Sequence, residues 1–254
     1  MKVKNETAIQ YLIGTFLLSY ISWGIMIAAS RIEALQYGTP CGMILFLMGG
    51  YSPTIVACIC LMRHKEVTGF KQIIKDCFTF RQNPMIYILL VGFLLLAYIV
   101  HILAGQIVVL EPFYMAIVMI PAMMFGGGLE EVGWRYLLQP VLERRFPFAL
   151  STMIMGVIWA LWHLPLFLIA GTNQNLYMSY PVFAVGIFGT AFILAFLRNY
   201  SKGIWPCILF HSTVNALAAS YAIQEKMLFT VITTVLEIVA VLLLNCVLKN
   251  REEA

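Results

Sequence analysis

Long apolar segments recur along the chain and are separated by short polar stretches. A bilayer core of about 30 Å needs roughly 20 residues of apolar helix. Measured against that length, the pattern predicts about eight transmembrane helices, at 8–29, 41–62, 85–105, 113–138, 149–170, 180–197, 203–222 and 226–248. The longest hydrophilic stretch is only 63–84, so we expect an all-α polytopic membrane bundle in which residues 1–254 form a single integral membrane domain.

Composition agrees with a membrane protein. Of the 254 residues, 61% are apolar and 11% are charged, whereas a soluble domain carries about 25% charged residues. The six cysteines share no zinc-finger or disulfide spacing and are interpreted as small apolar packing residues. The net charge of +4 is read as a sign of loop topology and does not predict a nucleic-acid partner.

The basic residues predict the orientation of the chain. If the N-terminus is cytoplasmic, fourteen of the sixteen Lys and Arg residues lie in segments on the inner side, the exceptions being Arg31 and Lys226. The connections at 106–112 and 171–179 carry no basic residue. This alternation follows the positive-inside rule and predicts a multi-pass protein of the plasma membrane with both termini cytoplasmic.

Few polar residues interrupt the predicted spans, and an ionisable group in a bilayer is costly enough to suggest a function. The set is Glu130, Glu131, Arg135, His163, His211 and Glu237, with Asn215 as a polar companion and His101 near an outer helix end. Three consecutive glycines at 126–128 precede the acidic pair and predict a weakened or broken helix there.

The acidic pair divides into two carboxylates with different surroundings. On a helix, Glu131 and Arg135 are four residues apart with the acid first, which is the favourable order for an ion pair. Glu130 points about 100° away around the helix and is left free to accept a proton. The structural alternative is a pair of acids that extend to the inner membrane surface.

Two further helices carry a histidine with a companion four residues away on the same face. Trp159 and His163 place an aromatic wall beside an imidazole, and His211 and Asn215 form a second pair. Taken singly, each pair has a structural explanation. His163 could hydrogen-bond a neighbouring carbonyl, and His211 and Asn215 could form an interhelical hydrogen-bond pair.

Together these groups are what hydrolysis by an activated water requires. Glu130 can take a proton from water, and His163 can hold that water or protonate the leaving amine. His211 and Asn215 can stabilise an oxyanion as donors. The same set could instead ligate a divalent ion such as Zn²⁺ through Glu130, His163 and His211.

The three segments resemble the motifs of the CPBP family, the CAAX-protease and bacteriocin-processing (Abi) intramembrane proteases. The EExxxR motif is matched by Glu130, Glu131 and Arg135, the aromatic-xxx-His motif by Trp159 and His163, and the HxxxN motif by His211 and Asn215. The family commonly has Phe where this chain has Trp159. The resemblance covers roughly residues 120–220, with a protease-like core at about 113–222.

The resemblance implies a helical bundle whose polar cavity opens to the cytosol and cleaves a peptide bond in a membrane-associated peptide or protein. It also implies that Glu130 activates water with His163 while His211 and Asn215 stabilise the oxyanion, supported by Glu131, Arg135 and Trp159. Family members are often called metalloproteases, yet this set can also work without a metal.

Two other functions compete with the protease. One is a proton-coupled secondary transporter, in which intramembrane acids and histidines relay protons, although the sequence shows no repeated pair of broken helices. The other is a non-catalytic family member that acts as an immunity or scaffold protein. Glu237 lies outside every motif and receives no catalytic role.

One expectation concerns depth in the membrane. In straight helices Glu130 would lie near the inner surface, whereas His163 would lie roughly 21 Å from the start of its span at the usual rise per residue. Helix tilt, a break at the three glycines, or a later start of the fifth span must bring them level.

Overall fold

The computed structural model describes residues 3–30, 35–224 and 226–252. Lys2, Arg31 and the side chain of Arg251, which contributed to the charge pattern, lie outside the described residues. Each predicted span contains a helix or a run of helices, with ends that differ from the prediction by a few residues. In chain order these are α1 (Asn5–Ser30), α2 (Pro40–Gly50), α3 (Ser52–Arg63), α4 (Phe70–Cys77), α5 (Pro84–Leu103), α6 (Phe113–Phe125), α7 (Gln139–Glu143), α8 (Phe148–His163), α9 (Asn173–Tyr177), α10 (Tyr180–Asn199), α11 (Trp205–Ser220) and α12 (Met227–Glu252).

The all-α membrane bundle is confirmed, but the count of about eight spans is higher than the structure gives. By length and composition, six helices of the described residues can cross a membrane, and seven if α2 and α3 count as one bent span. These two helices meet at an angle of 52°, next to Pro53 at the start of α3, where proline supplies no backbone donor. The seventh predicted span corresponds to α11, which has only 16 residues.

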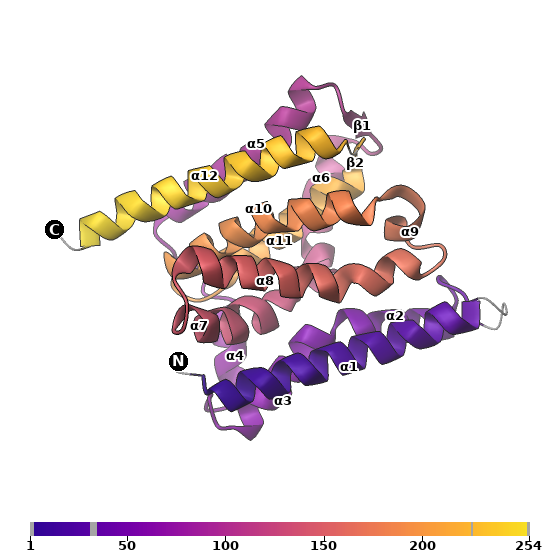
Figure 1. Ribbon diagram of the computed structural model, residues 1–254, viewed down its shortest axis with the longest axis horizontal. Coiled ribbons are helices and arrows are strands. Elements are labelled where there is room, and N and C mark those ends of the chain that lie inside the picture. The colour runs from indigo at the N-terminus through magenta and orange to yellow at the C-terminus, as the bar shows by residue number, and fades with distance from the viewer. Residues whose placement is uncertain (1–2, 31–34, 225, 253–254) are drawn as a thin grey trace.

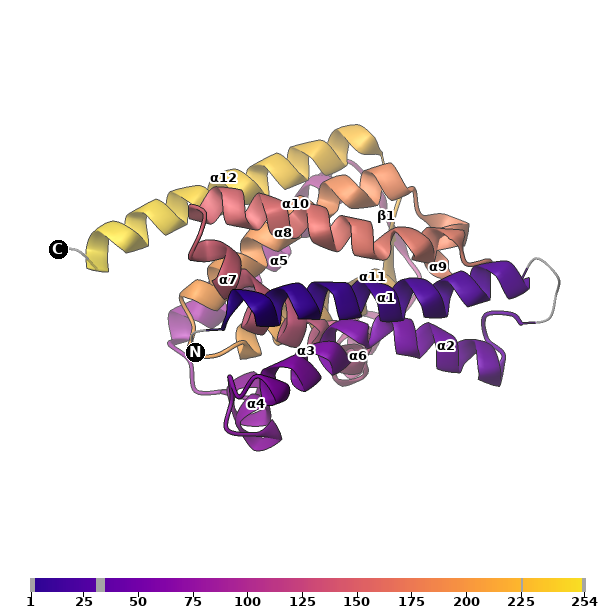
Figure 2. The same ribbon diagram turned by 60° about the horizontal axis from the view of Figure 1, so that its bottom comes forward.

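The bundle has α10 near its centre, packed between α8 and α12, while α11 packs against α6 and α1 packs against α2 and α3 (Figures 1 and 2). Side chains of α10 from Ala191 to Leu197 are completely or almost completely buried. On α1, by contrast, Ile9, Ile13 and Leu17 are each more than half exposed. An apolar face of this kind is stable in lipid, where it needs no aqueous solvation.

The two ends of the bundle carry different segments. The N- and C-termini, α4 and α7 lie toward one end, whereas β1 (Ile107–Val109) and α9 lie toward the other (Figures 1 and 2). The bundle therefore separates the connections that the charge pattern assigns to the inner side from those it assigns to the outer side.

A short antiparallel ladder corrects the end of the seventh predicted span. β1 pairs with β2 (Tyr221–Ile223), with Val108 opposite Ala222. Residues 221 and 222 were expected to be helical. Strands of three residues are too short to show an alternating pattern, so pairing with a distant partner decides their conformation.

The break expected at the three glycines is confirmed. Helix α6 ends at Phe125, and Gly127 has a φ of +150°, a conformation that side-chain-bearing residues rarely adopt. The chain continues as a 3₁₀ turn, η1 (Gly128–Glu130), and then as a seven-residue π-helix, η2 (Val132–Leu138), before α7. Because π-helical segments are rare and are frequently found at functional sites, this irregular stretch is a part of the fold where chemistry is expected.

Candidate active site

Glu131 lies at the centre of a buried polar group. Its Oε2 is 3.2 Å from Nε of Arg135, and its Oε1 is 2.8 Å from Nδ1 of His211 on α11. The Glu131 and Arg135 side chains are fully buried. The expected ion pair between residues four apart is therefore present, and a carboxylate that also accepts from an imidazole joins η2 to α11.

Glu130 has the separate environment that the sequence predicts. Its Oε2 accepts hydrogen bonds of 3.3 Å from the indole nitrogens of Trp134 and Trp159. Among the described residues, it forms no ion pair with Arg135, whose guanidinium lies over the Trp159 ring at 5.5 Å from the ring centroid. One carboxylate is thus neutralised by the arginine and its neighbour is not.

His163 presents one ring nitrogen for chemistry. Its Nδ1 lies 2.8 Å from the Trp159 carbonyl oxygen, which can only accept, so Nδ1 carries the proton and Nε2 holds a lone pair in the neutral ring. The imidazole packs edge-on against Trp159 and Trp162. This tautomer is the one that can accept a proton from water at Nε2.

His211 and Asn215 lie together beside the glycine break. The Asn215 amide donates to the Gly126 carbonyl oxygen at 3.2 Å. A β-carbon placed on Gly127 would lie 2.3 Å from Asn215 Nδ2 and 3.1 Å from His211 Nε2. Only a glycine therefore lets the backbone come this close to both side chains.

The glycine break also explains how Glu130 and Glu131 come to lie at the same depth in the bundle as His163 and His211. Helix α8 begins at Phe148, close to where the fifth span was expected to start, so a late start does not explain it. Trp159 bonds to Glu130, and Trp159 packs edge-on against both His163 and His211, with centroids 5.5 and 5.4 Å apart. The irregular backbone after α6 carries the acidic pair to the depth of the two histidines.

Several contacts of this site are not predicted by the sequence, and two of them differ in the signal that the sequence offers. The bond between His211 and Glu131 joins residues 80 positions apart, and no local pattern predicts it. The indole of Trp134 that donates to Glu130 had a usable signal, because the two residues are four positions apart on one helical face.

The side chains as they lie do not form a metal site. Among the described residues, no three His, Cys, Asp or Glu side chains are arranged to hold a metal ion. Nδ1 of His211 is engaged with Glu131, and Nδ1 of His163 with a carbonyl, so each imidazole has only Nε2 left for a ligand. These two nitrogens and the Glu130 carboxylate are not brought together as a ligand set among the described residues, so Glu130, His163 and His211 do not fit a metal in this arrangement.

Two other buried ionisable groups lie apart from these residues. Nδ1 of His101 lies 2.9 Å from Gln106 Oε1, within hydrogen-bonding distance. Glu237 is 4% exposed on α12 and packs against Gly189 of α10, where a β-carbon would lie 1.8 Å from Glu237 Oε2. Among the described residues, no hydrogen bond or ion pair joins either group to the candidate site.

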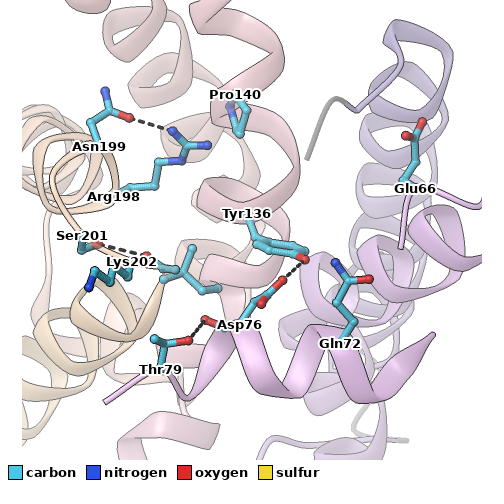
Figure 3. A pocket seen from close by; sticks show the side chains of 12 residues that line it. Glu66, Gln72, Asp76, Thr79, Tyr136, Pro140, Arg198, Asn199, Ser201 and Lys202 are labelled. Carbon is cyan, nitrogen blue, oxygen red and sulfur yellow. Dashed lines mark hydrogen bonds between the residues drawn. The ribbon is translucent and has the colours of Figure 1, made fainter. Parts of the chain in front are cut away.

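A cavity of about 560 Å³ opens at the end of the bundle that holds α4 and α7 (Figure 3). Tyr136 of η2 points into it and donates to Asp76 Oδ2 at 2.6 Å, and Arg198 and Asn199 at the end of α10 line another wall. Burial and the bond to Asp76 raise the pKa of Tyr136 well above its usual value. The cavity is lined by none of the candidate catalytic residues.

Comparison with known proteins gives two matches. The family described as "Type II CAAX prenyl endopeptidase Rce1-like" matches residues 111–217, a range that contains all three motifs. The chain is also 24% identical over 240 residues to CAAX prenyl protease 2 of Methanococcus maripaludis, with 85% of each chain covered. These matches support an intramembrane protease, and they confirm the resemblance of this chain to the CPBP family of intramembrane proteases.

Proposed function

We propose that this chain is a glutamate-dependent intramembrane endopeptidase that hydrolyses a peptide bond near the C-terminus of a membrane-associated substrate. One observation carries the proposal: Glu130 is held by two indole donors beside two imidazoles, while the buried arginine pairs with Glu131. An acid arranged in this way retains the ability to exchange a proton.

In this mechanism Glu130 takes a proton from a water molecule that Nε2 of His163 holds by accepting its second hydrogen. The water oxygen attacks the carbonyl carbon, and the carbonyl oxygen becomes an oxyanion. Donors from His211 Nε2, when protonated, and the Asn215 amide face the Gly127 backbone and stabilise that charge. Glu130 then delivers its proton to the leaving amine as the C–N bond breaks.

Glu131 supports the oxyanion donors. Its carboxylate accepts from His211 Nδ1 and so favours the doubly protonated imidazole, which donates from Nε2. Arg135 lies against the other oxygen of this carboxylate, with Nε 3.2 Å from Glu131 Oε2, and both side chains are fully buried. These roles require no metal ion, in keeping with the arrangement of the side chains.

The substrate class follows from the relatives' names and from the position of the site. We infer that the substrate carries a prenylated cysteine near its C-terminus, because both matches are described as acting on CAAX prenyl proteins. A lipid-anchored C-terminus lies at the membrane surface, within reach of a site that opens to the cytosol, as the resemblance to the CPBP family implies. The charge pattern of the loops supports the same orientation, with both termini of a plasma-membrane protein in the cytoplasm.

The test is cleavage in proteoliposomes of farnesylated and unmodified peptides that end in Cys-aliphatic-aliphatic-X, together with a library of unrelated peptides. Wild type is compared with Glu130→Gln, each with and without a chelator. We expect wild type to cleave the farnesylated peptide, Glu130→Gln to be inactive, and the chelator to have no effect.

Each outcome has a distinct meaning. Equal cleavage by both forms would show that Glu130 is not the base, and inhibition by the chelator would show that a metal takes part. If wild type cleaves none of the peptides, a scaffold or transporter gains support.

A further inference from the structure

A line of buried side chains connects the candidate site with the end of the bundle that holds α7. The line starts at His211 and Glu131, and continues through Arg135, Gln139 and Glu143 at successive intervals of four residues. Arg135 Nη1 donates to Gln139 Oε1 at 3.1 Å, and Gln139 Nε2 donates to Glu143 Oε1 at 2.8 Å. We call Glu131, Arg135, Gln139 and Glu143 the polar ladder.

The outer end of the polar ladder is anchored on α10. Asn199 Nδ2 donates to Glu143 Oε1 at 3.0 Å, and Arg198 Nη1 lies 3.7 Å from Glu143 Oε2. Arg198 and Asn199 line the 560 Å³ cavity (Figure 3). The ladder thus runs from a fully buried carboxylate to a partly exposed one, whose side chain is 18% exposed.

Gln139 holds the middle of the ladder. The contact between Arg135 Nε and Glu131 Oε2 is close, but neither atom makes a directed hydrogen bond. Among the described residues, the Arg135 guanidinium makes one directed hydrogen bond, from Nη1 to Gln139 Oε1. Gln139 is itself completely buried and also lies 3.4 Å from Thr152 on α8. The orientation of the arginine therefore depends on Gln139 as much as on Glu131.

The polar ladder runs along two kinds of helix. The step from Glu131 to Arg135, and most of the step from Arg135 to Gln139, follow the π-helix η2 (Val132–Leu138). The step from Gln139 to Glu143 lies within α7, where residues four apart share one face. The two directed hydrogen bonds along this row, and not the π turn alone, therefore make the ladder continuous.

We propose that Gln139 and Glu143 are positioning residues for the protease reaction: they fix the Arg135 guanidinium, which fixes Glu131 and through it the imidazole of His211. This inference rests on the proposed function for its activity readout. Neither residue touches the substrate, so the effect is expected on turnover and on the His211 imidazole.

The experiment compares Gln139→Leu, which removes all three contacts of the amide at similar volume, with Tyr136→Phe. Tyr136 lies on the same π-helix, and the change removes only its hydrogen bond to Asp76 at the cavity wall. With the farnesylated peptide in proteoliposomes, we expect Gln139→Leu to lower kcat by about 10- to 100-fold, the scale set by loss of a hydrogen bond to a charged group. KM should stay near the wild-type value, and Tyr136→Phe should leave both unchanged.

Glu143 supplies the conservative rescue. In Glu143→Gln an amide oxygen can still accept from Gln139 and Asn199, whereas Glu143→Leu removes the acceptor. We expect Glu143→Gln to keep most of the turnover and Glu143→Leu to lose it. Equal kcat values for Gln139→Leu and Tyr136→Phe, or equal losses for the two Glu143 variants, would overturn the proposal.

A second readout does not need activity. The chain has four histidines, so the proton on His211 Nδ1 can be assigned in a ¹⁵N-histidine NMR spectrum by its absence in His211→Gln. We expect this resonance to shift or broaden in Gln139→Leu and to stay in place in Tyr136→Phe. An unchanged resonance in Gln139→Leu would refute the ladder even if wild type were inactive on the peptide. Loss of activity in Glu130→Gln with full activity in Gln139→Leu would refute the ladder alone.

Discussion

Removing the charge of Glu131 should destabilise the protein more than any other single change of a carboxylate in the site. Glu131 and Arg135 are both fully buried and lie 3.2 Å apart. Taking away one partner of such a pair leaves an uncompensated charge in a medium of low dielectric, at about 3–5 kcal/mol. We therefore expect Glu131→Gln to lower the free energy of unfolding by that amount.

The assay is reversible unfolding in mixed micelles, followed by circular dichroism. The matched control is Glu143→Gln, because the pair between Glu143 and Arg198 is longer, at 3.7 Å, and partly exposed at 18% and 29%. Pairs of that kind contribute about 0–1 kcal/mol, so the control should unfold close to wild type.

A double-mutant cycle separates the pair from other effects of the substitutions. Arg135→Met alone should also destabilise, because it leaves the Glu131 carboxylate buried without its cation. The combination of Glu131→Gln with Arg135→Met should be less harmful than the sum of the single changes, by about 1–3 kcal/mol. If Glu131→Gln lowers the free energy of unfolding no more than the Glu143→Gln control does, the view that a desolvated ion pair stabilises the site is refuted.

The remaining predictions concern two glycines that lie against polar side chains, and the indole of Trp159 that donates to Glu130. Gly127→Ala should abolish cleavage, because a β-carbon would lie 2.3 Å from one candidate oxyanion donor at a φ of +150°; an active alanine variant would contradict this geometry. Gly189→Ala should lower the thermal midpoint, since its β-carbon would meet the Glu237 carboxylate at 1.8 Å, and adding Glu237→Ala should restore it. Failure of that second change to restore the midpoint would show that the α10–α12 contact has another origin. Trp159→Phe removes one 3.3 Å bond to Glu130 and should lower kcat about 2- to 10-fold, measured on the farnesylated peptide beside wild type; an unchanged kcat would mean that the indole does not orient this acid.

Hydrophobic length and charge determined most of the architecture. The requirement for apolar helices in lipid places all of the predicted spans on helices of the bundle, and three consecutive glycines indicate the break after Phe125. Spacing of four residues gives the pair of Glu131 with Arg135, since these groups share one face of one segment. The candidate residues Glu130, His163, His211 and Asn215 follow from the same reasoning, because polar groups in a bilayer are few.

Only the tertiary structure decided how these segments meet. The bond between His211 and Glu131 and the indole bond from Trp159 to Glu130 join different helices, and helical periodicity contains no information about packing partners. The small sheet that ends α11 likewise depends on a strand distant in sequence. The depth of Glu130 was decided by the break after Phe125 and the 3₁₀ turn that follows it. Residue spacing along a straight helix places Glu130 at the membrane surface, whereas the packed structure places it against Trp159, which contacts both histidines.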